Sequence, residues 1–299
     1  FKQKTAYEIR LSLVGSEMCI RDSLAYRRVS TNKGKNTPGI DGTTIKRIQE
    51  GVGKKNFLQE IRQTLRSDSF EPLPVRRHFI PKPNKPTERR ALGIPTITDR
   101  VVQSAILQII EPLFEARFLH VSHGFRPTRS VRDAIEQIRI TVYSPKRDRK
   151  KRRLSLPYKW VIEGDIEKCF DKINHHALMK RVRNAVSDKK VCRLIVAFLQ
   201  AGVMEELKFQ ITTTGTPQGG ILSPLLSNIA LSLIEERYQH WLQSENDSIP
   251  MSKRIKSGGH QRELDRKWGR PIFYPIRYAD DFVILCSGSH EDALKEKEK

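Results

Sequence analysis

The clearest hydrophobic pattern in the chain predicts a long helix that begins near Thr98. Apolar side chains recur there every three or four positions, at Val101, Val102, Ala105, Ile106, Ile109, Ile110, Leu113 and Phe114. This spacing places them on one face of a helix. Thr98 or Asp99 is the expected N-cap, and Pro112 is expected to kink the helix.

Fainter patterns predict further helices over residues 57–65 and 175–186. Another helix is expected to begin at Ser223, with Pro224 at its first position, and to run through to Trp241. The charged residues that end the chain predict the start of one more helix.

Short apolar runs predict strands at residues 75–80, 160–166, 207–213, 272–276 and 282–285. The segment PKPNKP, residues 81–86, predicts a turn, and the polar stretch 246–270 predicts a loop or insertion. Helices and strands alternate without a regular strand–helix–strand repeat. The sequence therefore predicts an α+β fold rather than a doubly wound sheet.

The two ends of the chain are expected to be unnatural or cut. Phe1 is not a start residue, and residues 13–23 (LVGSEMCIRDS) resemble a translated sequencing adapter. Residues 1–23 are therefore expected to be a non-native segment. A genuine N-terminal helix is the alternative.

Charge points to a polyanionic partner. The chain carries 55 Lys and Arg against 34 Asp and Glu, a net charge of +21. Nucleic acid is the leading candidate, because no basic amphipathic helix favours a membrane surface. A protein that is merely basic remains an alternative. The run KRDRKKRR, residues 146–153, fits a solvated loop or a phosphate contact, and both stay open.

The four cysteines, Cys19, Cys169, Cys192 and Cys286, form no CxxC pair and no zinc-ligand spacing. They predict reduced thiols of an intracellular protein. No apolar run approaches the length of about 18 residues that a membrane span needs. We expect a protein that is not secreted, located in a bacterial cytoplasm or an organelle.

Three carboxylates stand at the ends of apolar strands. Asp280 and Asp281 lie between two strands in RYADDFVIL, and Asp165 ends the strand WVIEGD. Acids from separate strands can hold two Mg²⁺ ions for phosphoryl transfer. Taken singly, the pair fits an ordinary turn and Asp165 fits a turn or helix cap.

Five segments together resemble the reverse transcriptases encoded by group II introns. In chain order they are residues 79–103, 123–130 (HGFRPTRS), 165–175 (DIEKCFDKINH), 215–231 (GTPQGGILSPLLSNIAL) and 278–281 (YADD). The resemblance covers about 36–293, and five segments in order are far more specific than YADD alone.

The resemblance implies a right-hand polymerase with fingers and palm and without a thumb. Four parts are expected: the non-native segment 1–23, an N-terminal extension with fingers at 24–145, a basic insertion at 146–159, and a palm at 160–299 with some fingers interleaved. It also implies an RNA-directed DNA polymerase, with maturase and homing roles in the full-length protein.

Catalytic roles follow by position. Asp165 and Asp280 would hold both Mg²⁺ ions, and Asp281 would complete the acidic cluster. Tyr278 and Ala279 would support the hairpin near the primer end. The implied partners are an RNA template, a DNA primer, deoxynucleoside triphosphates and group II intron RNA, and oligomeric state stays open.

Nucleotide contacts are implied for Lys82 and Arg90, whose charge suits a triphosphate, and for Gln218. Phe170, five positions after Asp165, would be a steric gate against a 2′-hydroxyl; a core phenylalanine is its alternative.

Template or primer contacts are implied for Gly219, Gly220 and Arg126. Glycines let backbone approach a ligand, although a plain turn fits them too. Arg126 would bind a phosphate or an acid of the palm, and both stay open.

The sequence departs from the family at Ala91, where a proline is usual, and in the long basic insertion. Other classes of enzyme compete with the main interpretation: retron, diversity-generating or phage-defence reverse transcriptases, and RNA-templated RNA polymerases. A catalytically idle RNA-binding scaffold or a folded but inactive fragment is the non-enzymatic alternative.

Overall fold

The computed structural model describes residues 16–82, 85–143, 146–147, 154–155, 157–167, 169–205, 208–210, 214–216, 219–242 and 258–299. The chain divides into two compact units, and each unit combines two separate stretches of sequence. The first unit contains residues 1–116 and 168–230, and the second contains residues 117–167 and 231–299. The chain therefore leaves each unit and returns to it.

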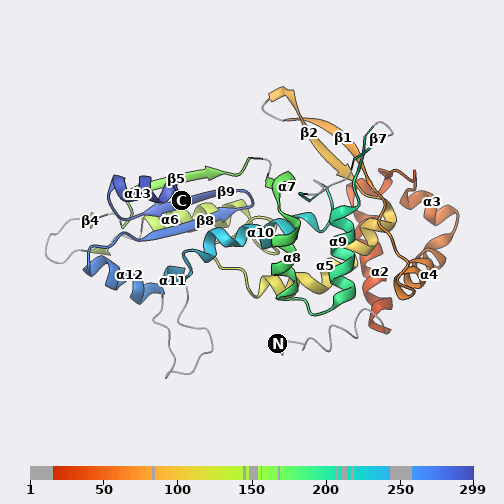
Figure 1. Ribbon diagram of the computed structural model, residues 1–299, viewed down its shortest axis with the longest axis horizontal. Coiled ribbons are helices and arrows are strands. Elements are labelled where there is room, and N and C mark those ends of the chain that lie inside the picture. Colours follow the sequence, from red (N-terminus) through yellow and green to blue (C-terminus); the bar gives the residue numbers. More distant parts are fainter. Residues whose placement is uncertain are drawn as a thin grey trace. The chain divides into compact units, whose positions relative to one another are not determined.

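The first unit is mainly helical. Its helices are α2 (Ser16–Thr31), η1 (Lys33–Asn36), α3 (Ile45–Glu50), α4 (Gly53–Arg66), α5 (Ile97–Glu115), α7 (Cys169–Lys172), α8 (His175–Arg183), α9 (Lys189–Gln200) and most of α10 (Ser223–Glu236) (Figure 1). Helix α2 packs along α5. It crosses the expected boundary after residue 23, and the buried Asp22 in it accepts a 3.0 Å hydrogen bond from Nη2 of Arg62 in α4.

A four-stranded sheet completes the first unit, in the order β2-β1-β6-β7. The strands are β1 (Val75–Lys82), β2 (Lys85–Ile94), β6 (Val203–Glu205) and β7 (Lys208–Gln210). Strand β1 pairs antiparallel with β2 and parallel with β6. A salt bridge of 2.8 Å from Arg77 to Glu205 ties β1 to β6.

The second unit is built on an antiparallel sheet in the order β5-β9-β8. Its strands are β5 (Trp160–Asp165), β8 (Phe273–Tyr278) and β9 (Asp281–Cys286). A separate short pair, β3 (Lys146–Arg147) and β4 (Leu154–Ser155), precedes β5 in the sequence. Its helices are α6 (Val131–Val142), α11 (Gln239–Leu242), α12 (Gly258–Lys267) and α13 (His290–Lys297). Helix α6 packs against β8 and α13 against β5 (Figure 1).

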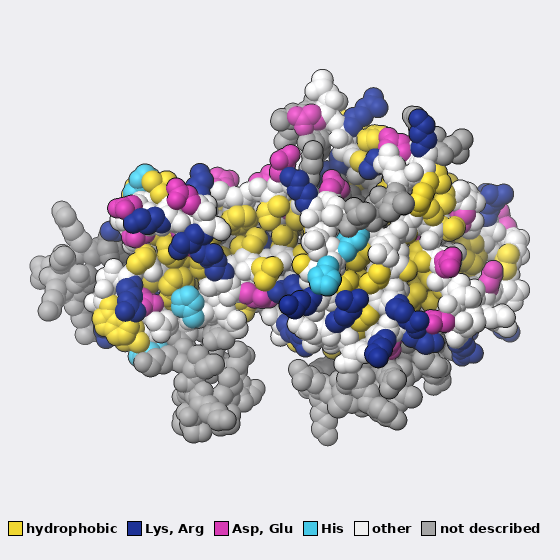
Figure 2. Space-filling model, in the orientation of Figure 1, with side chains coloured by type: hydrophobic (Ala, Val, Ile, Leu, Met, Phe, Trp, Pro, Cys, Tyr) yellow, Lys and Arg dark blue, Asp and Glu magenta, His cyan; other side chains and the backbone are white. Residues whose placement is uncertain are grey.

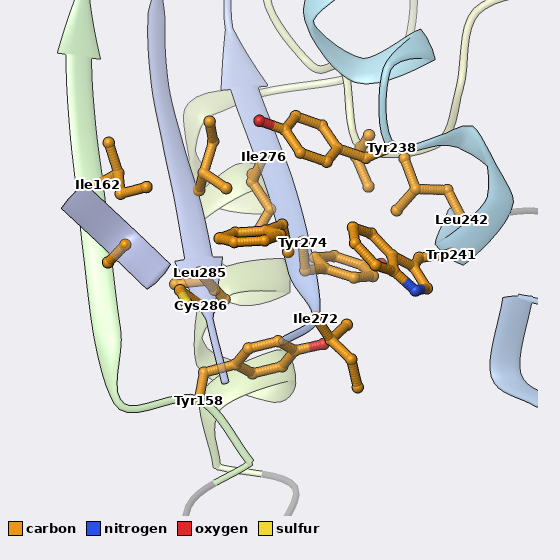
Figure 3. Close-up of a cluster of buried hydrophobic side chains, with 14 of the residues drawn as sticks. Tyr158, Ile162, Tyr238, Trp241, Leu242, Ile272, Tyr274, Ile276, Leu285 and Cys286 are labelled. Atoms are coloured by element: carbon orange, nitrogen blue, oxygen red, sulfur yellow. The ribbon is translucent and has the colours of Figure 1, made fainter. Parts of the chain in front are cut away.

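An aromatic-rich core holds this sheet to its helices (Figure 3). Tyr274 and Ile276 of β8 and Leu285 of β9 are buried, and Tyr238 and Trp241 reach the same cluster from the turn after α10 and from α11. Burying side chains of this size is the main favourable term in folding. The core therefore fixes the strand ends from which the candidate acids project.

The α+β fold expected from the sequence is confirmed, and most predicted elements are present. The long helix is α5, but the N-cap prediction was wrong. Thr96, not Thr98 or Asp99, is the cap, because its backbone is extended and its Oγ1 accepts a 3.1 Å hydrogen bond from the Asp99 backbone N–H. Helix α5 continues past Pro112 to Glu115.

Three other boundaries differ from prediction. The helix expected from Ser223 to Trp241 is two helices, since a turn at Arg237 and Tyr238 separates α10 from α11. Of the expected 81–86 turn, residues 81–82 belong to β1 and residues 85–86 to β2, while 83–84 lie outside the described residues. Of the expected strand 207–213, residues 208–210 are β7, while 207 and 211–213 lie outside the described residues.

The polar stretch 246–270 was predicted as a loop, yet it contains α12. Asp265 explains this helix, because its buried carboxylate accepts 2.9 Å and 3.1 Å hydrogen bonds from Trp241 Nε1 and Gln261 Nε2. A helix held by polar contacts has no apolar stripe to reveal it.

Cys169, Cys192 and Cys286 are all buried, and their reduced state stays a prediction. Across the described part of the chain, no helix has both the length and the apolar character needed to cross a membrane.

Candidate functional site

The three candidate acids meet at one end of the second unit's sheet. In the register of β5 and β9, Asp165 stands directly opposite Asp281. Tyr278 pairs with Asp281 across β8 and β9, which leaves Ala279 and Asp280 as a two-residue hairpin turn. Opposed residues of an antiparallel pair have Cβ atoms about 4.5–5.5 Å apart. Strand pairing thus brings together acids that are distant in sequence.

A fourth acid, Glu163, belongs to the same group. It lies two positions before Asp165 on β5, so both side chains share one face of the strand. Partial burial, then the charges of Asp280, Asp165 and Glu163, raise the pKa of Asp281 above its usual value. Glu163 was not predicted, although its alternation with Asp165 along the strand is visible in the sequence.

The chemistry of these acids suits a cation. Carboxylate oxygens are the ligands that Mg²⁺ prefers, and a bound cation would relieve the repulsion that raises the pKa of Asp281. Within the ranges that the structure describes, however, no three His, Cys, Asp or Glu side chains stand close enough to hold a metal ion as they are. The strand register brings the acids to one end of the sheet, but their side chains are not in a coordinating arrangement.

The turn that carries Asp280 has an uncommon backbone. Ala279 has φ of +57°, in the left-handed region that residues other than glycine seldom adopt. Arg277 Nη1 donates a 2.8 Å hydrogen bond to the Ala279 carbonyl. Gly124 lies against the turn from behind: a Cβ at Gly124 would be 2.1 Å from the Ala279 nitrogen. The turn is thus supported on two sides.

The loop that contains Gly124 pairs with β8. His123 N–H donates to the Arg277 carbonyl, and Arg277 N–H donates to the Val121 carbonyl, both at 2.9 Å. Arg126 closes this loop, since its buried guanidinium donates to the carbonyls of Leu119 at 2.9 Å and Ser122 at 2.8 Å. Arg126 therefore shapes the support of the turn. Its expected contact with a phosphate or a palm acid stays a prediction.

The other predicted nucleotide-binding residues belong to the first unit. Arg90 is exposed on β2, opposite Ile80 of β1. Lys82 ends β1, but its side chain lies outside the described residues, as does all of Gln218. Their contacts with a nucleotide stay predictions.

A cavity of about 170 Å³ in the first unit is lined by residues that include Arg77, Gly93, Asp171 and Thr216. Phe170 is half-buried in α7, and its carbonyl accepts a 2.6 Å hydrogen bond from Thr216 N–H. Gly219 has φ of +109°, and a Cβ there would be 2.6 Å from the Gly93 carbonyl oxygen.

The close approach at Gly219 is thus to the backbone of β2, and Gly220 follows it as a buried residue. The expected approach of both glycines to a template or primer stays a prediction.

Comparison with known proteins identifies relatives of this chain. Residues 80–298 match the family described as "Reverse transcriptase (RNA-dependent DNA polymerase)". The chain is 36% identical over 279 residues to "Protein YkfC" of Escherichia coli, which covers 91% of this chain and 70% of that protein. It is also 36% identical over 309 residues to "Group II intron-encoded protein LtrA" of Lactococcus lactis, covering 92% of this chain and 48% of that protein.

More distant relatives have similar coverage of this chain. The "Putative COX1/OXI3 intron 2 protein" of Saccharomyces cerevisiae is 27% identical over 298 residues, which is 90% of this chain and 32% of that protein. The chain therefore spans about half of the LtrA protein and a third of the yeast protein.

Proposed function

The chain belongs to the reverse transcriptase (RNA-dependent DNA polymerase) family, and from this premise we propose that Asp165, Asp280 and Asp281 form its catalytic centre. The observation that supports the assignment most is the register that sets Asp165 opposite Asp281 beside the Ala279–Asp280 turn. The reaction is nucleotidyl transfer, in which the primer 3′-hydroxyl attacks the α-phosphorus of a deoxynucleoside triphosphate and pyrophosphate leaves.

In this proposal Asp165 and Asp280 hold both Mg²⁺ ions, and Asp281 completes the cluster. Two bound metal ions would stabilise the charge on the attacking and leaving oxygens of the transfer. Tyr278 and Ala279 hold the hairpin near the primer end, so the 3′-hydroxyl meets the nucleotide at the acidic turn.

Further residues of the proposal contact the nucleotide. We assign the β1–β2 hairpin to the fingers and the β5-β9-β8 sheet to the palm of a right-hand polymerase. Lys82 and Arg90 bind the triphosphate, where arginine can form a two-pronged contact with phosphate oxygens. Gln218 contacts the nucleotide, and Phe170 excludes a 2′-hydroxyl from the sugar position. Gly219 and Gly220 lie along the template or primer.

The nucleic-acid partner is supported by charge. Lysine and arginine side chains gather over α8 and α9 in the first unit (Figure 2), where Lys180, Arg183, Lys189 and Lys190 are exposed. Such a face binds phosphates and releases counterions. Because relatives are named as intron-encoded, we propose group II intron RNA as a partner, with splicing and homing as roles of the full-length protein.

Primer extension on an RNA template tests the catalytic assignment. With Mg²⁺ and deoxynucleotides, the full-length protein should extend a DNA primer, and Asp280→Asn should lower the rate by at least about 1,000-fold, since the variant loses a metal-binding charge. RNA binding of the variant should stay within about threefold of the wild type, because binding depends on phosphate contacts elsewhere.

Two outcomes would redirect the assignment. Asp280→Asn activity near wild type would remove Asp280 from the centre. No extension by the wild type, with RNA still tightly bound, would favour the idle scaffold.

A further inference from the structure

We propose that Arg277 and Glu235 are a positioning pair for the acidic turn: their buried ion pair holds the Ala279 carbonyl, and through it the backbone that aims Asp280 and Asp281. The inference rests on the proposed function, because it assigns a role in the same reaction. Neither residue belongs to the proposed cluster of catalytic aspartates, and neither contacts the substrate in this assignment.

The pair is fully enclosed. Arg277 and Glu235 both have 0% side-chain exposure, and they are joined by two hydrogen bonds, from Arg277 Nε at 2.9 Å and from Nη2 at 2.7 Å. A two-pronged arginine–carboxylate pair fixes orientation as well as distance. Glu235 lies in the last turn of α10, so the pair joins α10 to β8.

The remaining donors of Arg277 point toward the support of the turn. Nη2 also donates to Ser122 Oγ at 2.7 Å, and Nη1 donates to the Ala279 carbonyl at 2.8 Å. One guanidinium thus joins α10, the loop behind the turn and the turn itself. Because Glu235 fixes the plane of the guanidinium, it also fixes where the bond to Ala279 points.

One general argument and one observation separate this arrangement from an ordinary buried ion pair. Replacing a buried pair with apolar residues is often neutral or stabilising, so stability alone gives little reason for a pair here. In addition, the carbonyl that Arg277 binds belongs to a residue with φ of +57°, a conformation that surrounding contacts must maintain. The bond from Arg277 is a contact of that kind.

The decisive variant is the double substitution Arg277→Met with Glu235→Met in the full-length protein. It leaves no unpaired buried charge, so it should fold with a melting temperature near that of the wild type. It nevertheless removes the donor to Ala279. We expect primer extension at saturating Mg²⁺ to fall about 100-fold, the scale of a displacement of about 1 Å at a catalytic group.

Hydrogen exchange provides a readout that does not depend on activity. Amides of residues 278–282 should exchange at least about tenfold faster in the double variant, while those of α13 stay unchanged. Arg277→Lys is the second variant: it retains a charge for Glu235 but cannot span Glu235, Ser122 and Ala279 together. It should also lose DNA synthesis and the protection of the turn amides from hydrogen exchange. The inference can therefore still be tested if the double variant does not fold.

Glu296→Gln is the matched control. Glu296 is another nearly buried acid of the second unit, and it accepts hydrogen bonds of 2.9 Å from Arg237 Nε and Tyr238 Oη. This variant should be less stable yet keep its rate and its turn protection. Loss of stability alone would therefore not imitate the expected result.

The inference is overturned if a folded double variant or Arg277→Lys extends primers within threefold of wild type and keeps its turn protection. If the wild-type protein synthesises no DNA, the proposed function fails separately. Turn exchange then decides the inference: faster exchange in the variants supports the positioning pair, and unchanged exchange overturns it.

Discussion

At the residue scale, Gly124 has no side chain, and its backbone lies directly against the turn of the proposed catalytic centre. Its backbone approaches Ala279 so closely that a Cβ would meet three atoms of that residue at 2.1–2.8 Å. Backbone cannot rotate away as a side chain can, so the turn itself would have to move. Glycine is required at this position by space and not by its own dihedral angles.

Gly124→Ala should therefore lower primer extension about 100-fold and destabilise the protein by about 1–3 kcal/mol. Gly34→Ala is the matched control, because a Cβ at Gly34 meets nothing within 4 Å. Comparing kcat and melting temperature for both variants checks the prediction. Wild-type kcat in Gly124→Ala would show that the turn tolerates displacement.

Phe170 is the residue on which sugar discrimination depends in our proposal. Phe170→Ala should raise the relative kcat/KM for ribonucleotides over deoxynucleotides by about tenfold or more, because the variant no longer fills the space under the 2′ position. The ratio is measured within one protein, so changes in expression or total activity cancel. An unchanged ratio would assign Phe170 to packing.

At the element scale, α5 carries a buried acid next to its N-cap. Burial raises the pKa of Asp99 to about 6, although hydrogen bonds from Thr96 and from the Leu73 backbone oppose the shift. Thr96 Oγ1 donates to Asp99 Oδ2 at 2.7 Å. Because burial outweighs these hydrogen bonds, the Asp99 carboxyl binds its proton more tightly in the folded state than in the unfolded state.

The contribution of Asp99 to the free energy of unfolding should consequently be highest below about pH 4 and should fall as the pH rises through about 6. At about 1.36 kcal/mol per pKa unit, the loss is at most about 3 kcal/mol. Asp99→Asn should remove this component while keeping an acceptor for the cap. Chemical denaturation between pH 4 and pH 7 checks it; an identical pH slope in both proteins would contradict the prediction.

Elements were predictable where one face is apolar and hidden where polar contacts hold them. The spacing of apolar residues predicts the elements at 101–114 and 282–285, and the ordered motifs predict roles for Asp165 and Asp280 that stay predictions. The cap at Thr96 was missed because neighbouring Thr98 and Asp99 suit the same role. Helix α12 was missed because its burial depends on Asp265 and its partner Trp241, 24 positions away.

Contacts between distant positions set the same limit on predicting the site. Arg277 stands beside the YADD motif, yet nothing local shows that it binds Glu235, 42 positions earlier, or Ser122, 155 positions earlier. Gly124 was part of a recognised motif, but its role depends on Ala279. The motifs predict which acids react, and only the fold reveals the residues that contact their turn.

At the scale of the whole molecule, the net charge of +21 should govern RNA affinity. We expect log K to fall linearly with log salt concentration. Lys180→Gln with Arg183→Gln should weaken binding to all sequences alike and reduce the slope by about one to two. Lys297→Gln, on α13, is the control. An unchanged slope in the double variant would exclude the α8–α9 face.

The interleaved units have a consequence for biosynthesis. Strand β5 ends at Asp165, but its partner β9 begins at Asp281, so the ribosome makes over a hundred further residues before the strands can pair. At about 5–20 residues per second this takes roughly 6–23 s. During that interval β5 is an unpaired edge, open to wrong pairing or to chaperones. In our proposal, a nascent chain therefore cannot bring its catalytic acids together until translation has passed the YADD turn.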